Sequence, residues 1–220
     1  MKTIVVIPAF NEGNRIREVL FKTKDSADQI IVVDDGSSEN KKVLSDDISE
    51  KIITLRHGIN LGKGAALKTG CLAALRLGAD IIIFMDADGQ HKPEDIPRFI
   101  KEIEEENIDI VFGSRKIGHN MPFMMTFGNR FLSTIIKFLF GVNISDTQSG
   151  FRAFRANIFD KVSWNTHNYS VETEMIVNTG KNKLRYSEIY IDTIYHDKYK
   201  GTTIFDGLRI FFNLIIWKII

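Results

Sequence analysis

The residues best suited to chemistry are Asp86 and Asp88, which directly follow the apolar segment 80–85. Side chains two positions apart in an extended backbone point to the same side, so both carboxylates can share one hard cation. Oxygen ligands suit Mg²⁺ or Mn²⁺, and such an ion keeps positions open for phosphate oxygens. The alternative is a pair of hydrated turn carboxylates. The position after an apolar strand favours the metal site.

Two more polar segments follow apolar runs, at residues 7–12 and 33–37. Ligands of open α/β sheets bind beyond the carboxyl ends of the strands, so we expect these loops to converge with residues 85–91. The Asp34-Asp35-Gly36-Ser37 sequence is also good turn chemistry. The two aspartates therefore either close an Asx-turn or, through Asp35, accept hydrogen bonds from a base or a ribose.

Residues 60–64, Asn-Leu-Gly-Lys-Gly, precede a helical pattern, so their N–H groups and Lys63 can meet a phosphate or a sugar hydroxyl. The segment is not a Walker loop, because only three residues separate Gly58 from Gly62, where four are needed, and Gly64 follows Lys63. Nor is it a dinucleotide fingerprint, since it lies late in the chain and lacks the third glycine. This disfavours a dinucleotide-dependent dehydrogenase.

The elements that must position these loops alternate along the first half of the chain. Short apolar runs are typical of buried parallel strands at 3–7, 29–34, 51–56, 80–85 and 109–113. Amphipathic stretches predict helices at 12–22, 64–77 and 93–105. In the second half, the patterns predict an apolar helix at 122–140, a short strand in 151–155 and a helix at 170–180. A strand at 184–195 and an amphipathic C-terminal helix at 204–220 follow. The alternation predicts an α/β, doubly wound, mostly parallel sheet.

The composition suits one large domain of 220 residues and excludes several classes of protein. With 29 basic and 28 acidic residues the net charge is +1, so no nucleic-acid partner is expected. The single cysteine, Cys71, excludes an intrachain disulfide and a multi-thiolate zinc site. Residues 1–9 form a strand pattern, so we expect no signal peptide there.

Seven ordered segments together resemble glycosyltransferase family two, and within it the dolichyl-phosphate and polyprenyl-phosphate sugar synthases. The segments are 8–12, 34–37, 60–64, 86–91, 113–115, 146–152 and 172–175. The resemblance covers nearly the whole chain and implies a GT-A fold, a Rossmann-like doubly wound mixed α/β sheet, with C-terminal amphipathic helices facing a membrane. It implies a nucleotide-sugar half at 1–115 and an acceptor half at 116–203, which together form the GT-A domain 1–203, and a juxtamembrane helix at 204–220.

The resemblance also implies an inverting, metal-dependent transfer of a sugar, mannose or glucose first, from a GDP- or UDP-sugar to a polyprenyl phosphate. Transfer to a glycan or another hydroxyl is the alternative. The nucleotide-sugar residues it implies are Pro8, Ala9, Phe10, Glu12, Asp35, Lys63, Asp86 and Ala87. The implied ligands of the divalent metal, Mg²⁺ or Mn²⁺, are Asp86, Asp88 and Gln90. The implied catalytic residues are Asp88, Arg115 and Glu174, and those for the acceptor phosphate are Arg115, Arg130, Ser133 and Thr134.

Several readings of these residues stay open. A lipid monophosphate is largely ionised near neutral pH, its second pKa being about 6, so it scarcely needs a general base. A hydroxyl acceptor would need a carboxylate as general base, for which Glu172 and Glu174 are the candidates.

The alternative to an acceptor site for the stripe formed by Arg130, Ser133, Thr134 and Lys137 is a solvated helix face. A nucleotidyltransferase would carry a glycine-rich basic loop after the first strand, which this chain lacks, and a non-catalytic scaffold would not need both metal carboxylates.

The two apolar helices, 122–140 and 204–220, favour peripheral or monotopic attachment to the cytoplasmic face of the cell membrane. Residues 204–220 are too short and too polar to span a bilayer comfortably. A basic loop with His196, Lys198 and Lys200 precedes them and favours anionic head groups. The alternative for these helices is core packing or the interface of a homodimer.

Overall fold

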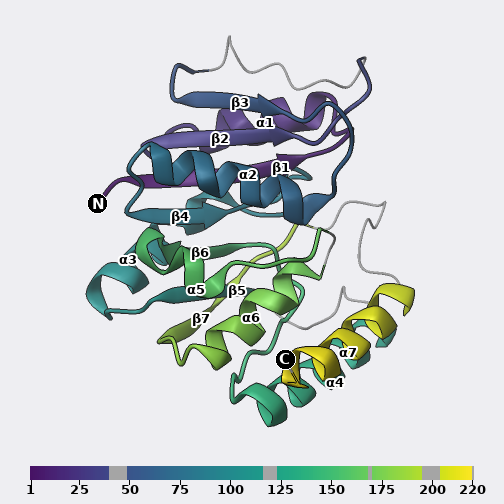
Figure 1. Ribbon diagram of the computed structural model, residues 1–220. Helices are drawn as coiled ribbons and strands as arrows, with labels where there is room; N and C mark the ends of the chain where they lie inside the picture. The colour runs from purple at the N-terminus through teal and green to yellow at the C-terminus, as the bar shows by residue number, and fades with distance from the viewer. Residues whose placement is uncertain (40–48, 116–122, 168–169, 195–203, 220) are drawn as a thin grey trace.

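The computed structural model describes residues 1–39, 49–115, 123–167, 170–194 and 204–219 (Figure 1). The predicted basic loop with His196, Lys198 and Lys200 lies outside the described residues.

In the described part of the chain, seven strands form one sheet in the order β3-β2-β1-β4-β6-β5-β7 (Figure 1). The strands are β1 Thr3–Ala9, β2 Gln29–Asp34, β3 Ile52–Arg56, β4 Ile81–Phe84, β5 Ile110–Arg115, β6 Arg152–Arg155 and β7 Tyr186–Ile191. Strand β6 runs antiparallel to both its neighbours, β4 and β5, and the other pairs are parallel. The predicted mostly parallel, mixed sheet is therefore confirmed.

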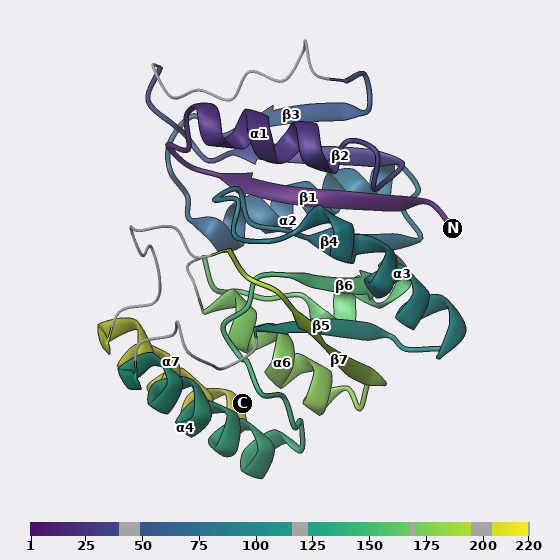
Figure 2. The same ribbon diagram turned by 180° about the vertical axis from the view of Figure 1, so that it is seen from behind.

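Helices cover both faces of the sheet, as a doubly wound fold requires (Figures 1 and 2). On one face lie α1 Asn14–Thr23 and α3 Ile96–Glu105, the latter preceded by the 3-10 turn η2 Pro93–Asp95. On the other lie α2 Lys63–Arg76, α5 Phe159–Val162, which follows the turn η3 Ala156–Ile158, and α6 Val171–Lys181. Alternate residues of β1 pack into the two hydrophobic cores, because successive side chains of a strand point to opposite faces of the sheet.

The last strand, β7, is shorter than the predicted strand 184–195. It pairs with β5 as far as Ile191, and Thr193 then forms an antiparallel bridge with His91. The backbone N–H of Ile194 also donates to the carbonyl of Gln90, at 3.0 Å. The chain after β7 therefore leaves the sheet and lies against the loop that follows β4.

Helices α4, Phe123–Phe140, and α7, Ile204–Ile219, lie side by side at one end of the molecule (Figures 1 and 2). The rings of Phe131 and Phe211 pack with centroids 6.1 Å apart, while Ile210 and Leu214 are buried in the core. The pair also carries exposed apolar side chains, here named the α4–α7 apolar surface: Phe131, Phe138, Phe212, Ile215, Ile216 and Ile219. None of the helices in the described ranges has the length and hydropathy needed to cross a bilayer.

Leu214→Ala tests whether α7 is packed on the protein core. Leu214 is fully buried, so we expect the free energy of unfolding in denaturant to fall by about 2–4 kcal/mol. The control is Ile216→Ala on the same helix, where 50% of the side chain is exposed and a loss below about 1 kcal/mol is expected. Equal losses in the two variants would contradict this packing.

Candidate active site at the carboxyl edge of the sheet

The loops after β1 and β2 are joined at the carboxyl edge of the sheet. The N–H of Asp35 donates to the carbonyl of Ala9 at 2.8 Å, and the N–H of Asn11 donates to Oγ of Ser37 at 2.8 Å. Ala9 is buried, Pro8 and Glu12 are half-buried, and Phe10 is exposed. The four residues predicted to hold the nucleotide sugar from this loop therefore lie together beside Asp35.

Asp35 fixes the next loop through both of its carboxylate oxygens. Oδ1 lies 2.6 Å from Nδ1 of His57 and accepts from the N–H of Leu61, and Oδ2 accepts from the N–H of Gly62 at 2.8 Å. Its neighbour Asp34 accepts from the N–H of Ser37 at 2.9 Å, which is the Asx-type turn that the sequence left open. Asp35 thus positions the segment that carries Lys63, and its contact with a base or ribose remains a prediction.

Gly62 and Gly64 pack directly against the chain at 166–167. A Cβ at Gly62 would collide with the carbonyl oxygen of His167, and one at Gly64 would collide with that of Thr166. Trp164 closes the contact by donating from Nε1 to the carbonyl of Gly64 at 2.8 Å. The glycines on either side of Lys63 are therefore needed for close packing, whatever they do for a phosphate.

Glu174 anchors the segment against which these glycines pack. Its Oε1 accepts from the N–H of Asn165 at 2.9 Å and its Oε2 from the N–H of Thr166 at 3.1 Å. Glu174 is buried at the start of α6. These two bonds make Glu174 an anchor of residues 165–166, and its catalytic role, which the resemblance implies, remains a prediction.

Lys63 reaches two carboxylates at the centre of the edge. Its Nζ lies 2.6 Å from Oδ1 of Asp86 and 2.7 Å from Oε1 of Glu172. Burial opposes the charge of Lys63, but the two carboxylates outweigh it, so the pKa of Lys63 is raised. Burial likewise opposes the charge of Asp86, and Lys63 outweighs it, so the pKa of Asp86 is lowered. Lys63 and Asp86 therefore each favour the charged form of the other.

Asp88 lies two residues further along the loop, after the buried Ala87. Its Oδ1 accepts from the N–H of Gln90 at 3.0 Å. Burial and the neighbouring charge of Asp86 raise the pKa of Asp88. A cation bound between the two carboxylates would relieve this repulsion.

The donor set fits a hard metal ion that shares its ligand shell with a substrate. Among the described residues, no group of three or more His, Cys, Asp or Glu could hold a metal ion by itself. Asp86 and Asp88 supply oxygen ligands, which Mg²⁺ and Mn²⁺ prefer, and leave other positions for phosphate oxygens. Gly150 makes room for this site, because a Cβ there would collide with the carboxylate of Asp86.

His91 orients the loop that carries the predicted metal ligands Asp86 and Asp88, a role that sequence reasoning missed. Its Nδ1 accepts from the backbone N–H of Asp86 at 3.2 Å, and burial lowers the pKa of His91. The ring stacks on Phe151 with centroids 5.0 Å apart, and Phe151 stacks in turn on Phe99. The only sequence signal was that His91 adjoins Gln90.

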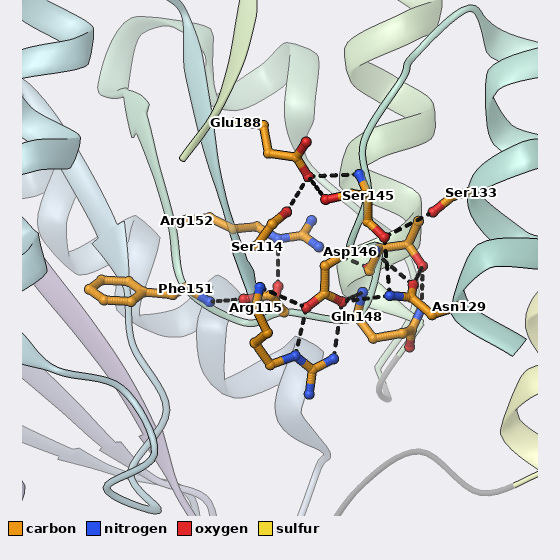
Figure 3. Close-up of polar contacts among 12 residues, drawn as sticks. Ser114, Arg115, Asn129, Ser133, Ser145, Asp146, Gln148, Phe151, Arg152 and Glu188 are labelled. Carbon is orange, nitrogen blue, oxygen red and sulfur yellow. Dashed lines mark hydrogen bonds and ion pairs between the residues drawn. The ribbon is translucent and has the colours of Figure 1, made fainter. Parts of the chain in front are cut away.

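Arg115 and Asp146 form a paired-fork ion pair beside this edge (Figure 3). Nε of Arg115 lies 2.6 Å from Oδ2 of Asp146, and Nη2 lies 3.0 Å from Oδ1. Burial opposes the charge of Asp146, but hydrogen bonds from Arg115 outweigh it and lower the pKa of Asp146. Arg115, predicted to meet a phosphate, is thus held by a carboxylate at the end of β5.

Helix α4 is joined to the same loop by Asn129, which sequence reasoning also missed (Figure 3). The buried amide of Asn129 donates to Oδ1 of Asp146 at 3.1 Å and accepts from the N–H and hydroxyl of Thr147 at 3.0 and 2.8 Å. One turn on, the hydroxyl of Ser133 donates to the carbonyl of Ser145 at 3.4 Å. A polar side chain one turn before Ser133 in an apolar helix was the available signal.

The other predicted acceptor residues on α4 face solvent. Arg130 and Thr134 are exposed, and the hydroxyl of Thr134 donates to the carbonyl of Arg130 in its own helix at 2.9 Å. The predicted stripe therefore divides, with Ser133 turned to the loop and Arg130 and Thr134 at the surface.

Arg152 ties the loop to the start of α6 from inside the protein. It is only 1% exposed and donates to the carbonyls of Ser149 and Thr147, at 3.0 and 3.1 Å, and to that of Glu172. Burial lowers the pKa of Arg152 to about 10. Loop 145–150 is thus held from three sides, by Arg115, by α4 and by Arg152.

Asp146→Asn tests the ion pair by the stability of the protein. It leaves Arg115 without its carboxylate, so the free energy of unfolding at about pH 7 should fall by about 3 kcal/mol. The folded pKa of Asp146 is lowered, so its stabilisation is present above the unfolded value of about 3.9 and is lost as the pH falls through the folded value. Denaturant titrations should therefore show that the difference in free energy of unfolding between wild type and Asp146→Asn becomes smaller in acid. The exposed Asp160→Asn is the control, and a wild-type-like Asp146→Asn would contradict the role.

Residues 4–163 match the family model described as Glycosyl transferase family 2. The UDP-N-acetylglucosamine–dolichyl-phosphate N-acetylglucosaminyltransferase of Methanococcus voltae is 35% identical to this chain, covering 97% of this chain and 95% of that protein. The dolichol-phosphate mannosyltransferase of Pyrococcus furiosus is 30% identical, over 99% of this chain and 65% of that protein.

Among solved structures, glucosyl-3-phosphoglycerate synthase from Mycobacterium tuberculosis, in complex with Mn²⁺, uridine diphosphate and phosphoglyceric acid, has the same fold. The TM-score is 0.77 at 18% identity, over 99% of this chain and 78% of that one. This likeness shows the fold, and the family model and the relatives identify the chain as a glycosyltransferase that belongs to glycosyl transferase family 2.

Proposed function

We propose that this glycosyltransferase moves a sugar from a nucleoside diphosphate sugar to a polyprenyl phosphate of the dolichyl type, at a membrane surface. One observation carries the proposal: loop 145–150 contacts both the predicted metal site and the apolar helix α4. Gly150 lies against the carboxylate of Asp86, while Asp146 and Thr147 bind Asn129. A sugar donor at Asp86 and a lipid phosphate at α4 would therefore meet across this loop.

The donor side would use the carboxyl edge of the sheet. Asp86 and Asp88, with Gln90, would hold Mg²⁺ or Mn²⁺, which neutralises the charge that develops as the nucleoside diphosphate departs. Lys63 and the loop with Pro8, Ala9, Phe10 and Glu12 would hold the nucleotide. Mannose and glucose are the first sugars to test, and the Methanococcus relative adds N-acetylglucosamine to the panel.

The acceptor side would need orientation more than acid–base chemistry. An acceptor phosphate oxygen forms the new bond to the anomeric carbon while the bond to the donor diphosphate breaks, with inversion of configuration. A phosphate monoester with a second pKa of about 6 is mostly ionised, so no base has to remove its proton. The two backbone N–H bonds of Glu174 suit an orienting role, which is all that an ionised phosphate acceptor needs from it.

The α4–α7 apolar surface would lie on the cytoplasmic face of the membrane, with the chain attached peripherally. Phe138 is 88% exposed and Ile219 is 80% exposed, so water meets apolar side chains on both helices. The exposed cations Arg130, Lys137 and Arg209 lie on the same two helices, where they would favour anionic head groups. Peripheral attachment would bring the lipid phosphate to Arg130.

The test of the reaction is transfer of labelled sugar by the purified protein. UDP- and GDP-sugars are supplied with Mg²⁺ or Mn²⁺ and a short polyprenyl phosphate in detergent. We expect metal-dependent label in an acid-labile lipid phosphate, which would also identify the donor. Label in a soluble glycan, with none in lipid from any donor, would overturn the acceptor and give a base role to Glu172 or Glu174.

Arg130→Ala tests the division between the two substrates. Loss of a guanidinium that pairs with phosphate should raise KM for the lipid phosphate about tenfold and leave KM for the sugar nucleotide within about twofold. Initial rates at varied acceptor and donor measure both constants. Lys161→Ala, an exposed cation on α5, is the control and should leave both unchanged. Equal rises in the two constants for Arg130→Ala would refute this assignment.

A further inference from the structure

The charge cluster at the donor edge contains its own cation. The ammonium of Lys63 bridges Asp86 and Glu172, at 2.6 and 2.7 Å, and contacts the same aspartate that is assigned to the metal. Lys63 follows the Gly62 backbone that Asp35 holds, so its main chain is fixed while its four-carbon side chain can still move.

The remaining oxygen of Glu172 supplies a second, independent observation. Glu172 is 4% exposed, and its Oε2 is buried with no hydrogen-bond partner among the described residues. A buried carboxylate oxygen without a partner is costly, so the arrangement is one that an arriving cationic group would stabilise. One lysine is shared between two carboxylates, so the formal charges of Lys63, Asp86 and Glu172 have a negative sum.

We propose that Lys63 is a resident counter-ion that occupies Asp86 until the metal and the donor arrive, and that Glu172 is the positioning residue that keeps Lys63 beside the site. The inference rests on the metal and donor sites of the proposed function. When the divalent ion binds Asp86, Lys63 leaves this carboxylate, remains next to Glu172 and places its ammonium on the donor diphosphate. The metal therefore competes with Lys63, whereas the nucleotide depends on it.

Competition with the metal follows from the charges. Two cations cannot share the Oδ1 atom of Asp86 at contact distance without strong repulsion, so each must weaken the binding of the other. Glu172 offers Lys63 a second anionic contact, which lowers the cost of leaving Asp86. Without Glu172, Lys63 would rest on Asp86 alone, and the site would attract a divalent ion less.

The test measures Mn²⁺ binding to the full chain without nucleotide. The electron paramagnetic resonance signal of free Mn²⁺ reports how much of the ion is bound. Lys63→Met should bind Mn²⁺ about tenfold more tightly than wild type, and Glu172→Gln should bind it more weakly. The control is Lys68→Met on the same helix, because Nζ of Lys68 donates to the carbonyl of Trp164 and should leave Mn²⁺ affinity unchanged. Glu172→Gln keeps the shape of the side chain, so the test stands even if Lys63→Met folds poorly.

The second arm measures UDP and GDP binding in saturating Mn²⁺ by calorimetry. Lys63→Met should lose about tenfold in affinity for the nucleotide that binds wild type, opposite in sign to its gain for the metal. General damage to the site would lower both affinities. The inference would be overturned, without affecting the proposed function, if Lys63→Met bound Mn²⁺ no more tightly than wild type. The same holds if Glu172→Gln bound Mn²⁺ more tightly than wild type. No Mn²⁺ binding by any variant, with or without UDP or GDP, would overturn the metal site with it, and lipid transfer tests the acceptor separately.

Discussion

The buried ion pair between Asp146 and Arg115 is the interaction on which the proposed acceptor half of the site depends. Asp146 is fixed by Arg115 at the end of β5 and by the amide of Asn129 on α4. A carboxylate this deeply buried is tolerated because charged and neutral donors surround it. The same hydrogen bonds set the position of α4 relative to the sheet.

A single loop therefore couples two environments of opposite character. On one side of loop 145–150 lie the charged groups of Lys63, Asp86 and Glu172. On the other lies α4, whose exposed Phe131 and Phe138 belong to the α4–α7 apolar surface. Glycine at position 150 allows the carboxylate of Asp86 to approach the loop closely. An enzyme that joins a water-soluble donor to a lipid phosphate needs such a boundary.

The fold was largely readable from the sequence, because local patterns decide it. Four-to-seven-residue apolar runs and the 3.6-residue period predict the strands and helices of the first half with small errors at the ends. The place of β6 was not readable. Its reversed direction between β4 and β5 depends on partners that are distant along the chain. The end of β7 at Ile191 depends likewise on the pairing of Thr193 with His91.

The candidate site was readable as a set of segments and less so as a set of contacts. Spacing placed Asp86 and Asp88 after a buried strand and Lys63 before a helix, and the resemblance added Arg115. The sequence could not show that Asp35 holds the loop of Lys63, because Asp35 is separated from Leu61 and Gly62 by 26 and 27 positions along the chain. The position of Glu174 in its motif likewise does not reveal that its carboxylate accepts two backbone N–H hydrogen bonds.

The most direct test of the central claim, that loop 145–150 brings a metal-bound donor and a lipid phosphate together, is ³¹P nuclear magnetic resonance of a short polyprenyl phosphate bound to the protein. With UDP or GDP and Mn²⁺ present, we expect the paramagnetic ion to broaden the acceptor phosphorus signal, and Asp88→Asn to abolish the broadening. An acceptor signal that stays sharp while the metal, the nucleotide and the lipid are all bound would contradict the account.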